Sequence, residues 1–328
     1  LEGGEPTQLT NFKYGASAPK WSPDGKQILF SASVSLKDLL KDSELNPKNE
    51  VPKWPLEKPG FAKNEFLLPS TASPNPDGNT EEIRAYLDLN ATDRKAKVIN
   101  KLNFQEEATT SPDINFSHLY VVSATPGATP KALTKGFYRF NGADFTPDGK
   151  QIIFTGNMDD TQHPDRALET CIYLVNTDGS NWKQLLGEKG RAFNSPKISP
   201  SGKWLAFQFG TTGFVDVPAL AIMPISGLEK DKIVLPFDRN KSGFNWSANE
   251  QYIYFTAQSN GGAPIYRVDV KTKQVEALTE AAAGISSYDI VGNKIVFVKT
   301  EVANPFELYL SDANGKNAKR ISSFNTGW

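Results

Sequence analysis

One short hairpin recurs along this 328-residue chain, and its recurrence restricts the fold more than any other feature. In its clearest copy the turn TPDG (146–149) precedes the apolar run IIF (152–154). Proline presets φ for a turn, aspartate bonds its own backbone and glycine accepts a positive φ, so this segment predicts a tight hairpin. The apolar run is too short for a helix and rich in strand-forming residues.

The same order of elements returns several times: a turn, an apolar run, a Tyr-centred strand and a closing segment of the Leu-Thr type. The turns lie at 21–25, 146–149, 198–202, 244–249 and 288–292, and the closing segments at 8–10, 132–134, 277–279 and 320–322. A repeat of roughly 40–50 residues with four short strands is typical of a propeller blade, because one such sheet cannot bury both faces alone. A two-sheet sandwich would explain the strands but not their ordered recurrence. We therefore predict an all-β fold, a β-propeller of four-stranded antiparallel blades, with about six blades recognisable.

Three segments depart from the repeat. Residues 6–10 are interpreted as the last strand of a blade whose first three strands are missing. We therefore expect residues 1–328 to belong to one propeller and the chain to be a fragment or a processed product. Residues 35–79 form a Pro-rich insertion with aromatic residues, predicted to be an ordered loop packed over the blades. Residues 79–90 predict one short inserted helix capped by Asn79 or Thr80, with two strands as the alternative.

The charge pattern excludes several classes of partner. The chain has 36 Lys and Arg against 37 Asp and Glu, and these residues are scattered. Neither a nucleic acid nor an anionic membrane surface is therefore an expected partner. No apolar run approaches the roughly 18–20 residues of a membrane span. The first residues contain neither an initiator Met nor a signal-peptide core, so they do not indicate a compartment.

Familiar catalytic motifs are absent: there is no Gly-x-Ser-x-Gly, Walker loop, Gly-x-Gly-x-x-Gly or Cys-x-x-Cys. His118 and His163 are the two histidines. His118 adjoins an apolar strand, where a satisfied structural imidazole is the better interpretation, and His163 has no paired nucleophile. The polar segment 157–169 contains several carboxylates but lacks the regular spacing of a metal-binding loop. We predict no catalytic residue, no metal site and no cofactor on this chain.

The WSPDGK-type hairpins with Leu-Thr closing strands resemble the propeller repeats of periplasmic TolB-type proteins and of the prolyl oligopeptidase family of serine peptidases. Four segments favour the peptidases, because they are similar to acylaminoacyl-peptidase and dipeptidyl-peptidase V relatives: KVINKL (97–102), SHLYVV (117–122), NPFELY (304–309) and SFN (323–325). The resemblance covers almost the whole chain. It implies a seven-bladed propeller in the whole protein.

In that family the propeller covers an α/β-hydrolase domain that carries a Ser-Asp-His triad, and this chain stops where that domain begins. The resemblance therefore implies a substrate-gating propeller of a periplasmic or secreted serine exopeptidase that releases dipeptides from peptide N-termini. The implied partners are the hydrolase domain, on the same polypeptide or as a companion fragment, and peptide substrates. A homodimer stays open.

The resemblance also implies a site, because dipeptidyl peptidases use propeller carboxylates to bind the substrate's α-ammonium group. Glu106 and Glu107, adjacent on a predicted hairpin, are the main candidates, and Glu169 is the reserve. An ammonium–carboxylate contact in a desolvated cavity would fix the distance of the scissile bond from the N-terminus. The longer aromatic-flanked acidic motif of the dipeptidyl peptidase IV branch is absent, and adjacent glutamates are by default a solvated acidic edge.

Two other functions stay as alternatives. The first is a TolB-like scaffold that binds proteins and performs no chemistry. The second, less favoured, is a glycosidase or lyase whose whole site lies on the blades.

Overall fold

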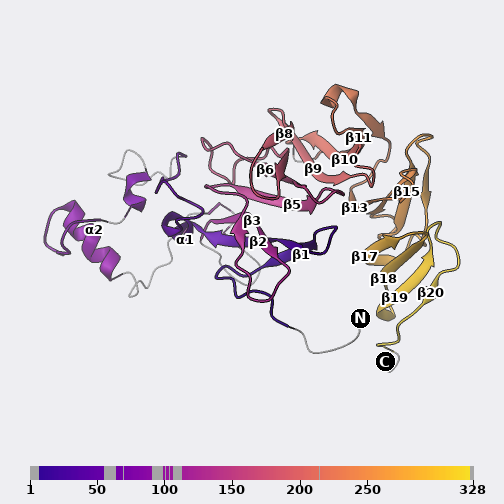
Figure 1. Ribbon diagram of the computed structural model, residues 1–328, viewed down its shortest axis with the longest axis horizontal. Coiled ribbons are helices and arrows are strands. Elements are labelled where there is room, and N and C mark those ends of the chain that lie inside the picture. The colour runs from indigo at the N-terminus through magenta and orange to yellow at the C-terminus, as the bar shows by residue number, and fades with distance from the viewer. Residues whose placement is uncertain are drawn as a thin grey trace. The chain divides into compact units, whose positions relative to one another are not determined.

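The computed structural model describes residues 7–54, 64–68, 70–90, 99, 101–102, 104–105, 113–213 and 215–325. These residues contain five antiparallel four-stranded sheets, which follow one another along the chain (Figure 1). Their strands are β1 Ser17–Trp21, β2 Gln27–Ser35, β3 Asn115–Ser123 and β4 Lys131–Ala132; β5 Arg139–Phe145, β6 Gln151–Asn157, β7 Cys171–Asn176 and β8 Lys183–Leu186; β9 Arg191–Ile198, β10 Trp204–Thr211, β11 Ala219–Pro224 and β12 Ile233–Leu235; β13 Lys241–Trp246, β14 Tyr252–Ala257, β15 Ile265–Asp269 and β16 Val275–Ala277; and β17 Gly284–Val291, β18 Lys294–Glu301, β19 Asn304–Asp312 and β20 Lys319–Arg320.

Within each sheet the strands pair in chain order, which is the connectivity of a propeller blade. The predicted all-β propeller of four-stranded antiparallel blades is confirmed. The predicted number of six recognisable blades is wrong, because the described residues form five.

The sixth predicted blade depended on residues 8–10, which form no strand in the structure. A closing strand needs a third strand beside it, and here the Leu9 carbonyl instead accepts a hydrogen bond from Gly127 N at 3.0 Å. Downstream, Lys13 Nζ and Tyr14 Oη each lie 2.6 Å from Asp42 Oδ2. These contacts hold residues 9–14 in an irregular conformation without a strand.

The recurring turn is held in the same way in several blades. In the second blade Thr146 Oγ1 donates to Asp148 Oδ1 at 2.6 Å and accepts from Gln151 N at 3.0 Å. Gly149 completes this turn at a φ of +70°, which side-chain-bearing residues rarely adopt. Ser22 makes the same two kinds of contact in the first blade. The hydroxyl at the start of the motif therefore closes the hairpin.

The Leu-Thr closing segment has an equally local cause. Thr134 Oγ1 accepts the backbone N–H of Leu119 at 2.9 Å, and Thr279 Oγ1 accepts that of Ile265 at 3.0 Å. Ser322 takes the same role in the last blade. Each hydroxyl satisfies an amide of the third strand just beyond the short fourth strand, which explains why the motif recurs.

The Tyr of the third strand stacks on the Phe of the second strand in four of the five blades. The pairs are Phe30–Tyr120, Phe154–Tyr173, Phe255–Tyr266 and Phe297–Tyr309, with ring centroids 5.5–5.7 Å apart. In the third blade Phe207 faces Ala221 instead. Such cross-strand aromatic pairs add to the stability of a sheet.

The connection between β2 and β3, residues 36–114, contains the predicted helix. This helix is α2 (Thr80–Leu89), and Asn79 caps it by accepting from the backbone N–H groups of Glu81 and Glu82. A second helix, α1 (Leu36–Lys41), was not predicted; it begins at the cap Ser35. Two short 3-10 helices are η1 (Asn64–Leu67) and η3 (Glu229–Asp231).

Within the Pro-rich insertion, Trp54 packs on the first blade. Its side chain is fully buried and contacts the rings of Phe116 and Phe137 at centroid distances of 6.0 Å. The predicted strand at 97–102 lies largely outside the described residues, and positions 99, 101 and 102 are in no strand.

The chain forms two compact units. Unit 1 comprises Leu1–Ala143, Gly156–Leu168 and Thr177–Ser180, and unit 2 comprises Asp144–Thr155, Glu169–Asn176 and Asn181–Trp328. In unit 2 each pair of successive blades shares one apolar cluster, so the third and fourth sheets are buried on both faces. This explains why the second strands of these sheets are continuously apolar rather than alternating.

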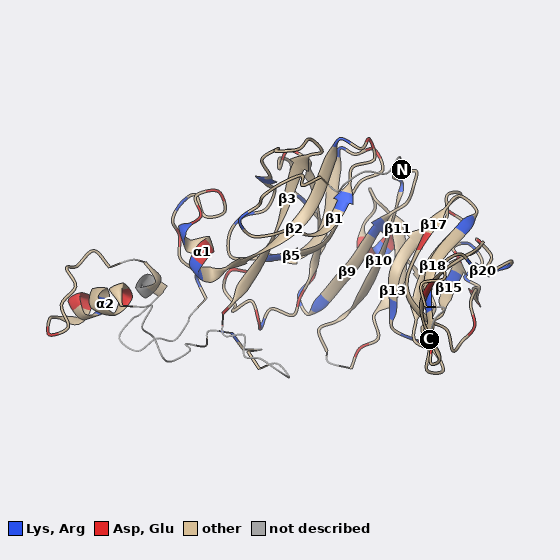
Figure 2. Ribbon diagram, turned by 90° about the horizontal axis from the view of Figure 1, so that it is seen from below, with Lys and Arg blue, Asp and Glu red and all other residues tan. Residues whose placement is uncertain are grey.

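Basic and acidic residues are interspersed along the strands (Figure 2). No helix in the described part of the chain is long and apolar enough to cross a membrane.

Candidate functional site

The predicted site residues all lie in connections between the second and third strands of a blade. These connections are residues 36–114 in the first blade and 158–170 in the second. In an antiparallel blade such a connection is at the end where the first strand starts. We call this the loop end of the blade, and the opposite end, which carries the recurring hairpins, the turn end.

Glu106 and Glu107 lie outside the described residues, but the segment that leads to them is partly described. The backbone N–H of Leu102 donates to Asp165 Oδ2 at 2.8 Å. On its other oxygen Asp165 pairs with Arg139 Nη1 at 2.7 Å, and its side chain is only 3% exposed. Burial acts to raise the pKa of Asp165, but the hydrogen bonds from Leu102 and Arg139 outweigh it and the pKa is lowered. Asp165 thus links Leu102 to Arg139, the first residue of β5.

The excursion at 157–168 is fixed by the same insertion. Lys53 forms an ion pair with Asp160, and the Trp54 and His163 rings lie 6.0 Å apart in an edge-on arrangement. The backbone N–H of Asp165 donates to His163 Nδ1 at 3.2 Å. These contacts give His163 a structural role. Among the described residues no group of three His, Cys, Asp or Glu side chains could hold a metal ion.

Glu169, the reserve candidate, is half-buried at the junction of the second and third blades. Its Oε1 accepts from Gly190 N at 3.3 Å. The neighbouring residue Thr170 pairs with the start of β9, where its carbonyl accepts from Phe193 N at 2.9 Å. Glu106 and Glu107 lie outside the described residues, so of the three predicted glutamates the structure places only Glu169.

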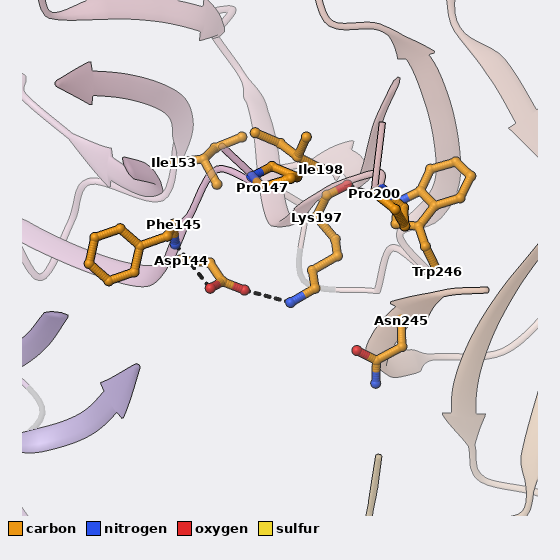
Figure 3. A pocket seen from close by; sticks show the side chains of 9 residues that line it. All are labelled: Asp144, Phe145, Pro147, Ile153, Lys197, Ile198, Pro200, Asn245 and Trp246. Atoms are coloured by element: carbon orange, nitrogen blue, oxygen red, sulfur yellow. Dashed lines mark hydrogen bonds and ion pairs between the residues drawn. The ribbon is translucent and has the colours of Figure 1, made fainter. Parts of the chain in front are cut away.

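A pocket that the sequence analysis did not predict lies at the turn end in unit 2 (Figure 3). We call it the turn-end pocket. Its volume is about 220 Å³, and its lining residues are Asp144, Phe145, Pro147, Ile153, Lys197, Ile198, Pro200, Asn245 and Trp246. It is formed where the first strands of three successive blades end. The available signal was the repeat itself, because Asp144, Lys197 and Asn245 occupy the same position, two residues before the turn's Thr or Ser.

An ion pair forms the polar side of the turn-end pocket. Asp144 Oδ2 lies 2.5 Å from Lys197 Nζ, and both side chains remain about one-quarter to one-third exposed. The other carboxylate oxygen accepts from Phe145 N at 3.0 Å. The indole N–H of Trp246 donates to the Lys197 carbonyl at 3.0 Å, which joins the third and fourth blades. Figure 3 shows the Asp144 and Lys197 side chains pointing toward each other on one side of the apolar lining residues.

The chain is built of four-stranded blades, and in unit 2 the first strands of the third, fourth and fifth blades lie side by side, which defines the protein as a β-propeller. Residues 71–214 match the family described as the dipeptidyl peptidase IV N-terminal region. The chain is 21% identical over 343 aligned residues to dipeptidyl-peptidase 5 of Porphyromonas gingivalis, covering 99% of this chain and 49% of the relative. It thus spans about half the length of that curated relative.

Solved structures confirm the fold. A TolB protein from Agrobacterium tumefaciens superposes with a TM-score of 0.55 at 18% identity, covering 96% of this chain and 83% of the other. An acylaminoacyl peptidase from Pyrococcus horikoshii gives a TM-score of 0.52 at 13% identity, covering 94% of this chain and 38% of the other. Together these findings confirm the resemblance to the propeller domains of the prolyl oligopeptidase family.

Proposed function

We propose that this chain is the substrate-gating propeller of a periplasmic or secreted serine exopeptidase that releases dipeptides from peptide N-termini. The catalytic triad belongs to an α/β-hydrolase domain on the same polypeptide or on a companion fragment. Glu106 and Glu107, with Glu169 in reserve, bind the substrate's α-ammonium group. The propeller selects peptides by their free amine and by the distance from that amine to the scissile bond.

The observation that carries this proposal is the hydrogen bond from Leu102 to Asp165, whose carboxylate is in turn paired with Arg139. It fastens the segment that leads to Glu106 and Glu107 at the loop end of β5. The first strand of a blade is the one nearest a propeller's central channel, so a segment that starts from this point can present its carboxylates to a peptide in the channel. The relative named dipeptidyl-peptidase 5, which aligns with nearly the whole chain, supports the same activity.

The test replaces Glu106 and Glu107 by Gln together in the intact protein. The KM for a dipeptidyl chromogenic substrate with a free amine should rise about 10–100-fold, as expected for loss of a charge-assisted hydrogen bond worth about 1.5–3 kcal/mol. Glu50→Gln is the matched control, since Glu50 is an exposed carboxylate of the same insertion whose Lys48 contact is as long as 3.9 Å. An unchanged KM in the double variant would remove both glutamates from the site.

A TolB-like scaffold without chemistry is the second candidate function. It is favoured by the superposition on the Agrobacterium TolB protein, which covers most of both chains. Labelling of the intact protein with a serine-directed fluorophosphonate probe, followed by intact mass spectrometry, separates the two. A labelled hydrolase-sized segment or companion supports the peptidase, and absence of any labelled species supports the scaffold.

A further inference from the structure

We propose that the turn-end pocket is a second peptide-binding site, which takes an extended, uncharged segment through one backbone residue and one aliphatic side chain. The proposal deepens the proposed function, on which it rests for the ligand class. It adds a contact at the turn end of the blades, whereas the amine site is assigned to the loop end.

The ion pair supplies the polar part of this recognition. A residue in an extended chain presents its N–H and its C=O on the same side, as paired residues of antiparallel strands do. Asp144 can accept the N–H, and Lys197, whose ammonium carries three donors, can donate to the C=O while keeping its contact with Asp144. Both bonds are charge-assisted and hence stronger than bonds between neutral groups. The partial exposure of both side chains leaves them accessible to a ligand.

The opposite side of the pocket suits an aliphatic side chain. Ile153, Ile198 and Trp246 are buried, and Pro147 and Pro200 complete the apolar side. Because the Asp144 and Lys197 charges neutralise each other, an ionic side chain would be desolvated without gaining an opposite charge. The pocket therefore favours a residue such as Leu over Asp or Lys.

The same repeat position provides a matched control for the test. In the first blade it is occupied by Lys20, which lies on β1 and is exposed. Lys20 and Lys197 thus share charge and place in the blade, but Lys197 lines the pocket and Lys20 does not. A variant at each position separates binding in the pocket from the general effect of losing a positive charge.

The experiment titrates the full chain with acetyl-Ala-Leu-Ala-amide, using isothermal calorimetry. Both ends of this probe are blocked, so the amine-binding glutamates cannot contribute. The affinity for this probe should fall about tenfold in Lys197→Gln, the loss expected for one charge-assisted hydrogen bond. It should stay unchanged in Lys20→Gln. Acetyl-Ala-Asp-Ala-amide should bind more weakly than the Leu probe.

Absence of saturable binding, or equal binding by Lys197→Gln and the wild type, overturns the proposal. Thermal unfolding checks that each variant is folded. In Lys197→Gln the Asp144 carboxylate loses its partner, which could disturb the pocket by itself. The double variant Asp144→Asn/Lys197→Gln leaves no unpaired charge and should lose binding as well, which separates the loss of binding from that disturbance. Failure of dipeptide release by the intact protein would count against the amine site alone, because the blocked probe reports only on the turn-end pocket.

Discussion

The first and fourth blades both bury polar side chains, but they differ in whether those side chains find hydrogen-bond partners. In the first blade three fully or almost fully buried atoms have no hydrogen-bond partner among the residues that the structure describes: Trp54 Nε1, His118 Nε2 and Tyr120 Oη. In the fourth blade Lys241 is only 5% exposed, yet its ammonium donates to three carbonyls.

The difference shows what each part of the repeat can supply. The carbonyls around Lys241 belong to Pro218, Phe237 and Arg239, at distances of 3.0, 3.2 and 2.8 Å, and come from connections on both sides of the third blade's last two strands. Short connections thus bring unpaired backbone acceptors to a buried donor. In the first blade the long insertion covers the core with the Trp54 side chain instead, which fills space but accepts no hydrogen bond.

The largest expected effect comes from removing the donor of the fourth blade. Lys241→Met should lower the free energy of unfolding by about 3 kcal/mol, because it leaves buried carbonyls without a partner. Urea unfolding at neutral pH measures the change. Lys271→Met, at an exposed position after β15, is the control and should change the stability by less than about 0.5 kcal/mol. Equal stability of the two variants would mean that the carbonyls around Lys241 are rehydrated at little cost.

The next effect tests the first blade through pH. His118 is fully buried with Nδ1 3.1 Å from Thr134 Oγ1, and burial lowers its pKa to about 4 from an ordinary value of 6.5. The unfolded chain therefore binds a proton between pH 6.5 and 4 that the folded chain does not. The stability is complete above pH 6.5 and falls as the pH is lowered toward 4, by about 3 kcal/mol in total.

Urea unfolding at pH 7.0 and pH 4.5 measures this loss, and His118→Gln should reduce it, because the variant has no imidazole to protonate. The carboxylates titrate alike in both proteins, so the difference between their pH slopes isolates the histidine. Identical slopes would show that His118 is hydrated in the folded chain.

The sequence predicted the parts of the fold that have local causes. The turn at Thr146 and the cap at Asn79 are closed by residues within about five positions, and the Phe–Tyr stacks follow from the repeat. The number of blades could not be predicted as well, because the sequence of residues 8–10 resembles a closing strand but these residues form no strand in the structure.

The sites depend on contacts between distant residues, which local patterns do not reveal. The Asp144–Lys197 pair spans 53 positions and the Leu102–Asp165 bond spans 63. His118 was interpreted as a satisfied structural imidazole; it is buried with Nδ1 on Thr134, but its Nε2 has no partner among the described residues. The roles of Glu106, Glu107 and Glu169 stay predictions.

The smallest expected effect compares two buried tyrosines, one from each blade. Tyr254 Oη donates to the Ala313 carbonyl at 3.0 Å, whereas Tyr120 Oη has no partner in the described part of the chain. Removing a satisfied hydroxyl leaves an acceptor unpaired, but removing an orphan takes away only a desolvated group. Tyr254→Phe should therefore lower the free energy of unfolding by about 1 kcal/mol, while Tyr120→Phe should leave it unchanged or raise it by up to about 1 kcal/mol.

Equilibrium unfolding at pH 7 measures the two changes under the same conditions. Both rings keep their surroundings, since only one oxygen is lost. A cost for Tyr120→Phe that equals that of Tyr254→Phe would reveal a bound water as its partner and would make the two blades alike in how they satisfy buried polar groups.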